Sequence, residues 1–229
     1  MTMNAHSTDE KSLREAQEAA AAFELCGIVL QAEISAEAVG MLAARDESAL
    51  VIEVSGDLAR SCLECLDVWR ASVDSGDLEE ETASLGREWF RLFAGPGKPA
   101  APPWASYYTD KDSALFGADT MRARAWYRRY GLEIERKNSE PDDHVGLLLV
   151  FLAHLTHCEA KAIDAGSADD IALARREQVA FMEECLLPWV TRWAELVEGN
   201  ARSPFYAGFT RIAVGTMLRR HEVLSAALR

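Results

Sequence analysis

Two adjacent acids and an imidazole, Asp142, Asp143 and His144, stand directly before the longest apolar run of the chain, residues 145–155. Glu140 and Pro141 precede them. Proline suits the first position of a helix, and carboxylates are stabilised by the positive end of the helix dipole. A protonated histidine is disfavoured there, so helix stability does not account for His144. We interpret the run as a helix start, over residues 142–164, whose acids can also bind a cationic partner, and we expect a binding role for His144 as well.

A second group of candidate residues flanks a loop rich in glycine and proline, residues 94–105. Leu92 and Phe93 precede the loop, and Trp104 and Tyr107 close it. An ordinary helix end, with Gly95 in a left-handed turn, accounts for the glycine and proline. It leaves the aromatic cluster unexplained. An apolar groove lined by aromatic side chains is what an amphipathic peptide helix docks into.

Other motifs with chemical potential are incomplete. The segment 95–99 lacks the spacing of a phosphate-binding loop, and Pro99 removes a backbone donor. Cys62 and Cys65 form a lone pair without the second pair that a zinc site needs. His154 and His157 share a helix, but the metalloprotease pattern is absent. No nucleophile elbow or dinucleotide fingerprint is present, so we expect no catalytic residue, cofactor or metal.

Composition narrows the classes of partner and compartment. The formal net charge of −13 disfavours nucleic acid, whose phosphates require a basic face, and favours a cationic partner. An odd number of cysteines, 5, without a disulfide-like spacing indicates a reducing compartment. The polar N-terminus lacks the features of a signal peptide, and the longest apolar run is too short to span a bilayer. We therefore expect a cytoplasmic protein without stable membrane insertion.

Helical periodicity dominates the chain and predicts an all-α protein of about nine or ten helices in one domain, residues 1–229. Its N-terminal part spans 13–131, a polar hinge spans 133–139, and its C-terminal part spans 140–227. Spacing places Met121, Trp126 and Tyr130 on the inward face of one helix. Helices are expected over 13–32, from Ser35, and over 57–73, 78–93, 119–130, 142–164, 168–186, 188–198 and 203–227.

Four segments in this order resemble the TorD/DmsD family of cytoplasmic molybdoenzyme chaperones, over about residues 13–224. Two are the motifs already described, within 91–107 and 140–144. The others are 187–189 (Leu-Pro-Trp) and 203–206 (Ser-Pro-Phe-Tyr). The form of the 140–144 motif is closest to the DmsD-like branch.

The resemblance implies an all-helical chaperone that is not an enzyme. Such a protein binds the twin-arginine leader, and also the mature part, of a molybdoenzyme catalytic subunit, and delays export until the cofactor is inserted. By motif position, the resemblance assigns peptide binding to Leu92, Phe93, Pro103, Ser106, Tyr107, Asp143 and His144. To these we add Glu140 and Asp142 as acids near the groove, and Trp89 and Trp104 from helical spacing and loop position. Trp104 departs from the smaller or tyrosine-like aromatic usual in the family. We expect Asp143 and His144 to form part of the leader-binding surface.

Two alternatives stay open from the residues. One is an assembly factor that binds the mature subunit of a nitrate-reductase-like enzyme without reading a leader. The other is a helical metal-dependent enzyme that uses His154 and His157. Some relatives in the resembled family are linked to guanine nucleotides, for which these residues offer no independent support. The hinge at 133–139 permits either a monomer or a dimer that exchanges helical halves.

Overall fold

The helices predicted from periodicity make up most of the computed structural model, which describes residues 2–44, 57–74, 77–109, 116–134 and 141–229. Within these ranges the chain forms ten α-helices and two π-helical segments, and its β contacts are limited to one bridge between Trp104 and His144. The predicted all-α class is therefore confirmed. In chain order the elements are α1 (Thr2–Gln31), α2 (Ala36–Ala44), α3 (Asp57–Asp74), α4 (Leu78–Trp89), the π-helical η2 (Phe90–Ala94), α5 (Ser106–Thr109), α6 (Ala118–Arg129), α7 (Val145–Asp164), α8 (Ala168–Phe181), the π-helical η3 (Met182–Leu186), α9 (Val190–Asn200) and α10 (Pro204–Ala227).

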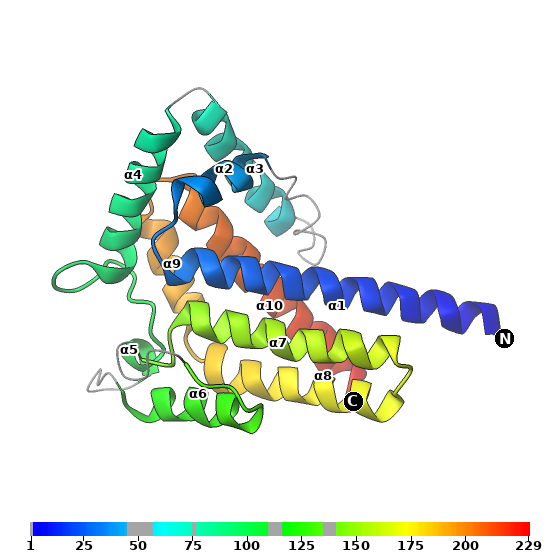
Figure 1. Cartoon of the computed structure of the whole chain (residues 1–229). Coiled ribbons are helices and arrows are strands. Elements are labelled where there is room, and N and C mark those ends of the chain that lie inside the picture. Colours follow the sequence, from blue (N-terminus) through cyan, green and yellow to red (C-terminus); the bar gives the residue numbers. More distant parts are fainter. Residues whose placement is uncertain (1, 45–56, 75–76, 110–115, 135–140) are drawn as a thin grey trace.

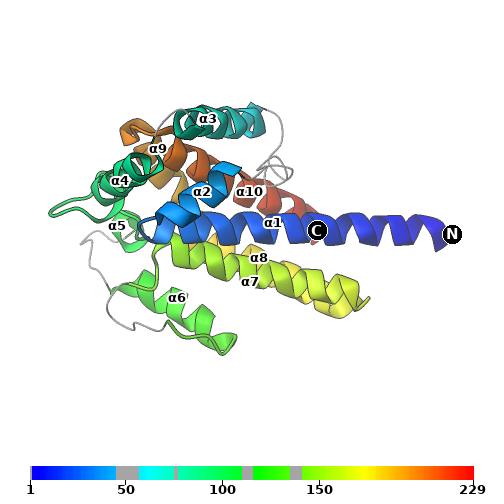
Figure 2. The same ribbon diagram turned by 45° about the horizontal axis from the view of Figure 1, so that its top comes forward.

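Helices α1 and α7 run side by side in opposite directions through the middle of the molecule (Figures 1 and 2). They touch at two glycines, because a Cβ placed on Gly146 would lie 2.7 Å from the carbonyl oxygen of Gly27 and 2.6 Å from Cβ of Gln31. Any larger residue would hold the two backbones apart. This contact fixes the first turn of α7 against the last turns of α1.

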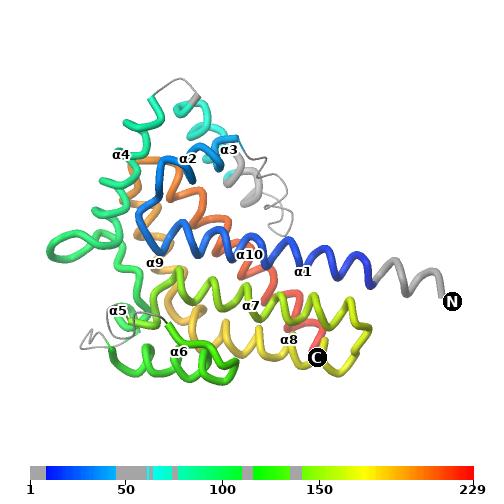
Figure 3. The backbone as a smooth tube through the Cα atoms, in the orientation of Figure 1, coloured from blue at the N-terminus to red at the C-terminus, as the bar shows by residue number. Residues whose placement is uncertain are grey.

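The remaining helices complete the core on either side of this pair. Helix α8 folds back along α7, and α10 packs against α1, α3, α8 and α9 (Figure 3). Aromatic side chains fill the space between them. The largest fully buried ones are Trp69, Trp189, Trp193, Tyr206, Phe23, Phe93, Phe181, Phe205 and Phe209.

A buried polar network ties α7, α8 and α10 together. The carboxylate of Glu159 accepts hydrogen bonds from Arg175 Nε (2.7 Å), Gln178 Nε2 (2.8 Å) and the guanidinium of Arg220. Arg220 Nε also donates to Gln178 Oε1 at 2.8 Å. A buried carboxylate is tolerated only when it is paired in this way.

Among the described helices, α7 is long and apolar enough to cross a bilayer by length and composition. The apolar window of α7 is 67% buried inside the protein. Its apolar residues are therefore those of a core helix, packed between α1 and α8.

Several predicted boundaries and faces need correction. Helix α7 begins at Val145 rather than residue 142, so Asp142 and Asp143 precede the helix. Met121 is exposed, and the buried residues of α6 are Thr120, Ala123, Trp126 and Tyr127. The short helix α5 was not predicted.

Other predictions at helix ends were partly right. The predicted spans 78–93 and 168–186 end in the π-helical segments η2 and η3. Gly95 has φ −54°, and the left-handed residue of this loop is Gly97, with φ 100°. Ser203 caps α10 as expected for a Ser-Pro start, accepting from Phe205 N at 3.1 Å. The side chain of Cys62 and most of the predicted hinge, from residue 135 onward, lie outside the described residues.

The α1–α7 contact yields a stability prediction. We expect Gly146→Ala to lower the free energy of unfolding by about 1–3 kcal/mol, because the added methyl group meets backbone atoms that have no room to move. Gly199→Ala is the matched control. A Cβ at this position of α9 meets nothing within 4 Å, so alanine there should be neutral or stabilising by up to about 1 kcal/mol. Urea unfolding measures both, and equal effects would contradict the packing argument.

Candidate functional site

The two motifs singled out from the sequence meet in space. Val145 N donates to Pro103 O at 2.7 Å, and Ala105 N donates to Asp143 O at 3.2 Å. The β bridge between Trp104 and His144 lies between these bonds. We call this contact, between residues 102–107 and 141–146, the junction. It holds the end of the Gly/Pro loop against the start of α7.

Asp143 joins the junction to α6. Its carboxylate accepts from Ser106 N at 2.8 Å and from Thr120 Oγ1 at 2.6 Å, and the side chain is buried. Ser106 is the first residue of α5, so Asp143 supplies the acceptor that a helix N-terminus needs. The acid therefore caps a helix other than the one it precedes in sequence.

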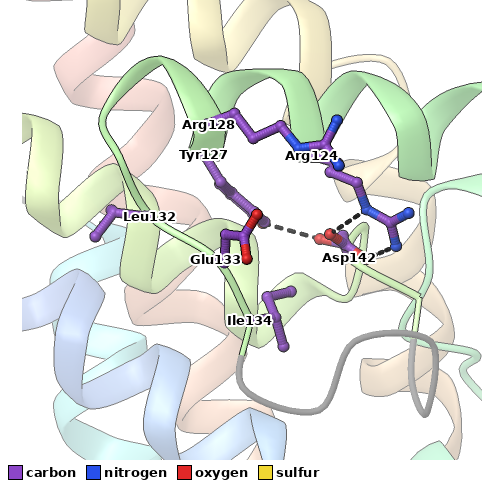
Figure 4. Close-up of a pocket in the computed structure, with 7 residues that line it drawn as sticks. All are labelled: Arg124, Tyr127, Arg128, Leu132, Glu133, Ile134 and Asp142. Carbon is purple, nitrogen blue, oxygen red and sulfur yellow. Dashed lines mark hydrogen bonds and ion pairs between the residues drawn. The ribbon is translucent and has the colours of Figure 1, made fainter.

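Asp142 makes a separate set of contacts with α6. Its carboxylate accepts from Arg124 Nε at 3.0 Å and from Arg124 Nη2 at 2.7 Å, which is the two-pronged geometry of a strong arginine–carboxylate pair. Tyr127 Oη donates to the carbonyl oxygen of Asp142 at 2.8 Å. Figure 4 shows these groups around a small pocket that Leu132, Glu133 and Ile134 also line. The carboxylates of Asp142 and Asp143 are thus both hydrogen-bonded to groups within the protein.

His144 caps α7 as a neutral acceptor. Its Nδ1 accepts from Gly146 N at 3.1 Å, and its ring packs edge-on against Trp104, with 6.0 Å between ring centroids. Burial lowers the pKa of His144 to about 3, so the ring carries no charge at neutral pH. The conflict between a charged histidine and the helix dipole therefore does not arise.

Two polar atoms at the junction have no hydrogen-bond partner among the described residues. They are Trp104 Nε1 and Ser106 Oγ, both buried. Buried donors are nearly always paired, so each such atom calls for an explanation. Both belong to residues that the sequence predicted to contact a peptide.

The exposed part of the junction is aromatic. Trp104, Tyr107 and Tyr108 are half-buried, and Tyr108 stacks on Trp189 with 5.3 Å between ring centroids. Lys98 Nζ lies 5.1 Å from the ring centroid of Tyr107. Of these, Trp104 and Tyr107 belong to the predicted site, and both are partly exposed.

Leu92 and Phe93 occupy a different position from the one expected. Both are buried, and the Phe93 ring lies 5.7 Å from Tyr206 and 6.3 Å from Trp193. In this structure they belong to the core and line no open groove. Trp89 is half-buried, and its Nε1 donates to Leu30 O at 3.3 Å, on the α1 side of α4.

The predicted residues thus fall into two places. Pro103, Trp104, Ser106, Asp143 and His144 meet at the junction, with Asp142 beside them. Trp89, Leu92 and Phe93 lie on α4 and η2, and the backbone bond from Ala101 N to Leu92 O, at 2.8 Å, links this segment to the loop. Glu140 lies outside the described residues.

Sequence reasoning missed the partners of the acids. Thr120, Arg124 and Tyr127 all come from α6 and hold Asp142 or Asp143. Their spacing of four and three residues places them on one helix face. That spacing could have identified the face of α6 that contacts the acids. The inward face was instead assigned from Met121 and Tyr130, because their side chains are more apolar.

The two histidines of α7 make ordinary contacts. His157 Nε2 lies 3.6 Å from Glu24 on α1, and the His154 ring stacks on Phe151. Within the described residues, no three His, Cys, Asp or Glu side chains gather as a metal site would require.

The chain is similar in sequence to one protein family and to several known chaperones. A sequence model of the family described as nitrate reductase delta subunit matches residues 53–195. The Tat proofreading chaperone DmsD of Salmonella typhimurium is 32% identical over 130 residues, which are 57% of this chain and 57% of that protein. The chaperone protein TorD of Aliivibrio fischeri is 29% identical over 136 residues, 59% of this chain and 62% of that protein. A probable Tat proofreading chaperone DmsD of Haemophilus influenzae is 25% identical over 157 residues, 65% of this chain and 70% of that protein. The chain thus spans less than two thirds of the first two of these relatives.

The buried imidazole makes stability depend on pH in a defined direction. The unfolded chain binds a proton at His144 below about pH 6.5, whereas the folded protein does so only near pH 3. Protonation therefore favours unfolding as the pH falls from 6.5 toward 3, by at most about 1.4 kcal/mol per pH unit. His144→Asn keeps a capping acceptor and removes this titration. Urea unfolding between pH 7 and pH 4.5 should show that the variant loses less unfolding free energy than wild type. Equal losses would show that His144 does not cause the pH dependence.

The pair between Asp142 and Arg124 should contribute much more than a surface ion pair. Asp142→Ala leaves a largely buried guanidinium without its carboxylate, which we expect to cost about 3–5 kcal/mol of unfolding free energy. Glu222→Ala removes an exposed pair with Arg219 on α10 and should cost less than about 1 kcal/mol. Chemical denaturation compares the two, and a loss below about 1 kcal/mol for Asp142→Ala would show that the pair is dispensable.

Proposed function

Because the chain belongs to the nitrate reductase delta subunit family, we propose that it is a system-specific chaperone for a molybdenum-cofactor-containing oxidoreductase subunit. The resemblance to TorD and DmsD predicted from the sequence motifs is confirmed. In this proposal the protein binds the twin-arginine leader of its client, and the mature part of the same subunit, in the cytoplasm. Binding delays export until the cofactor is inserted and the client is folded.

The observation that carries the proposal is the likeness to proteins named Tat proofreading chaperone DmsD, together with the family match over residues 53–195, which include the junction. The net charge of −13 supports the same partner, since an acidic protein attracts a cationic leader. The names of the relatives are those of chaperones, in keeping with a role that is not enzymatic.

Within the junction we propose a division of roles. Trp104 and Tyr107, which are half-buried and aromatic, contact the leader directly. Trp104 Nε1 and Ser106 Oγ are buried and have no hydrogen-bond partner among the described residues, so in this proposal they bond to backbone groups of the peptide only when the junction opens to admit it. Asp143 and His144 act by holding residues 103–107 in position, because their own polar atoms serve α5 and α7.

A second candidate function has an observation in its favour. The matching family is described by the name of a nitrate reductase subunit, which fits an assembly factor that binds a mature enzyme subunit and does not read a leader. Calorimetry with isolated leader peptides separates the two. A leader-binding chaperone binds one of the leaders alone, whereas an assembly factor of this kind binds only the subunit.

We expect one twin-arginine leader from the molybdoenzyme subunits of the same genome to bind the full chain in isothermal titration calorimetry. Trp104→Ala and Tyr107→Ala should each weaken that binding by about tenfold or more, as aromatic anchors do. Leu173→Ala, which removes exposed apolar surface on α8, should leave the affinity unchanged. If all three variants bind as wild type does, the junction is not the leader site.

A further inference from the structure

An apolar pocket of about 370 Å³ lies between the end of α1 and α2, outside the junction. Its volume falls within the range typical of ligand pockets, about 300–1,000 Å³. Ile28 and Met41 stand at its mouth and are 59% and 68% exposed. We call it the α1–α2 pocket; its lining residues are Leu25, Ile28, Val29, Ala32, Glu33, Ile34, Ser35, Ala38, Met41 and Leu42.

The pocket and the junction share one stretch of α1. Gly27 and Gln31 pack on Gly146, in the first turn of α7 beside His144. Leu25, Ile28 and Ala32 line the pocket from another face of the helix, because residues three and four apart point the same way. The end of α1 therefore lies between the two sites.

Helix α4, which packs against α2, carries a residue already predicted to bind peptide, Trp89. Trp89 Nε1 donates to the carbonyl of Leu30, in the last turn of α1. The carboxylate of Glu33 lies over Gly86, so close that a Cβ there would displace it. Trp89 thus contacts the last turn of α1, and Glu33, just after α1, contacts the same helix α4 at Gly86.

The charged residues described in the pocket lining and in α2 are acidic. Glu33 lines it, and Glu37 stands in the first turn of α2. The lining contains no lysine or arginine, and none occurs in α1 from Leu25 to Gln31 or in α2. An apolar pocket with two glutamates at its described edge complements a segment that carries apolar side chains next to cationic ones.

We infer that the α1–α2 pocket receives the apolar stretch of the client's leader, while Glu33 and Glu37 meet its arginines. This inference rests on the proposed function, because a twin-arginine leader is a segment with a cationic start and an apolar continuation. Docking would cover Ile28 and Met41, as an amphipathic helix does when its apolar face enters a groove. The leader would then contact the two sides of α1 at separate points, with the junction as the other contact.

The test uses the full chain and the leader that binds wild type most tightly in the calorimetric panel. Ile28→Gln with Met41→Gln makes the mouth of the pocket polar at two exposed positions. We expect this double variant to bind the leader at least tenfold more weakly. Met121→Gln, at an exposed methionine on α6 away from the pocket, is the matched control and should bind as wild type does.

Charge is tested in the same assay. Glu33→Gln with Glu37→Gln should weaken binding severalfold and make the remaining affinity less sensitive to salt, since fewer exposed ion pairs form. Glu80→Gln, at an exposed acid on α4, should change neither quantity. Equal salt dependence in wild type and the double variant would overturn the assignment of the acidic rim.

A direct readout locates the peptide independently of affinity. With methionine methyl groups labelled by ¹³C, the Met41 resonance should shift on addition of the leader while that of Met121 does not. If wild type binds the leader but Met41 stays unchanged and the Ile28/Met41 variant binds normally, the pocket inference fails and the proposed function stands. If no leader binds, both fail. A dimer in solution that the Ile28/Met41 variant abolishes, with leader binding kept, would assign the pocket to a second copy instead and overturn the inference.

Discussion

Two neighbouring carboxylates, Asp142 and Asp143, are buried where three segments of the chain meet, and each must find donors inside the protein. Arg124 supplies them to Asp142, and Ser106 N with Thr120 supplies them to Asp143. Those donors come from α6 and from the end of the Gly/Pro loop. Burying the acids therefore fixes both segments against the start of α7. A buried pair of this kind is weak evidence for extra stability, but breaking it is costly, which makes the arrangement specific.

The start of α7 is itself fixed by the glycine contact with α1. Because Gly27 and Gly146 bring the two backbones together, the end of α1 touches the junction on one side and lines the α1–α2 pocket on the other. The open apolar pocket thus lies along packed helices, and backbone bonds to the start of one of them hold the half-buried aromatic residues of the junction. Binding sites built on such elements hold their geometry before a partner arrives, so less ordering is required on binding.

Much of the fold was predictable because apolar spacing is a local property. The spans of α2, α6, α8 with η3, and α10 follow from periodicity, caps and turns, all of which act within a few residues. The order of the four motifs was equally local and indicated the family. On α6 the predicted inward residues Trp126 and Tyr130 do pack against the core, whereas Thr120 and Arg124 were missed because they are polar. Their burial depends on carboxylates 18–23 residues further along the chain, which no helical pattern of α6 reveals.

The sequence by itself determined the helical class, the positions of most helices and the family, because each depends on residue types at short spacing. Tertiary structure alone decided the state of the candidate residues. His144 is a neutral cap, because burial removes the charge that its sequence position seemed to make unfavourable. Leu92 and Phe93 are core residues, because α10 and α9 bring Tyr206 and Trp193 onto the same ring. Burial and partner choice depend on contacts between residues distant in the chain, and these exist only once the helices have packed.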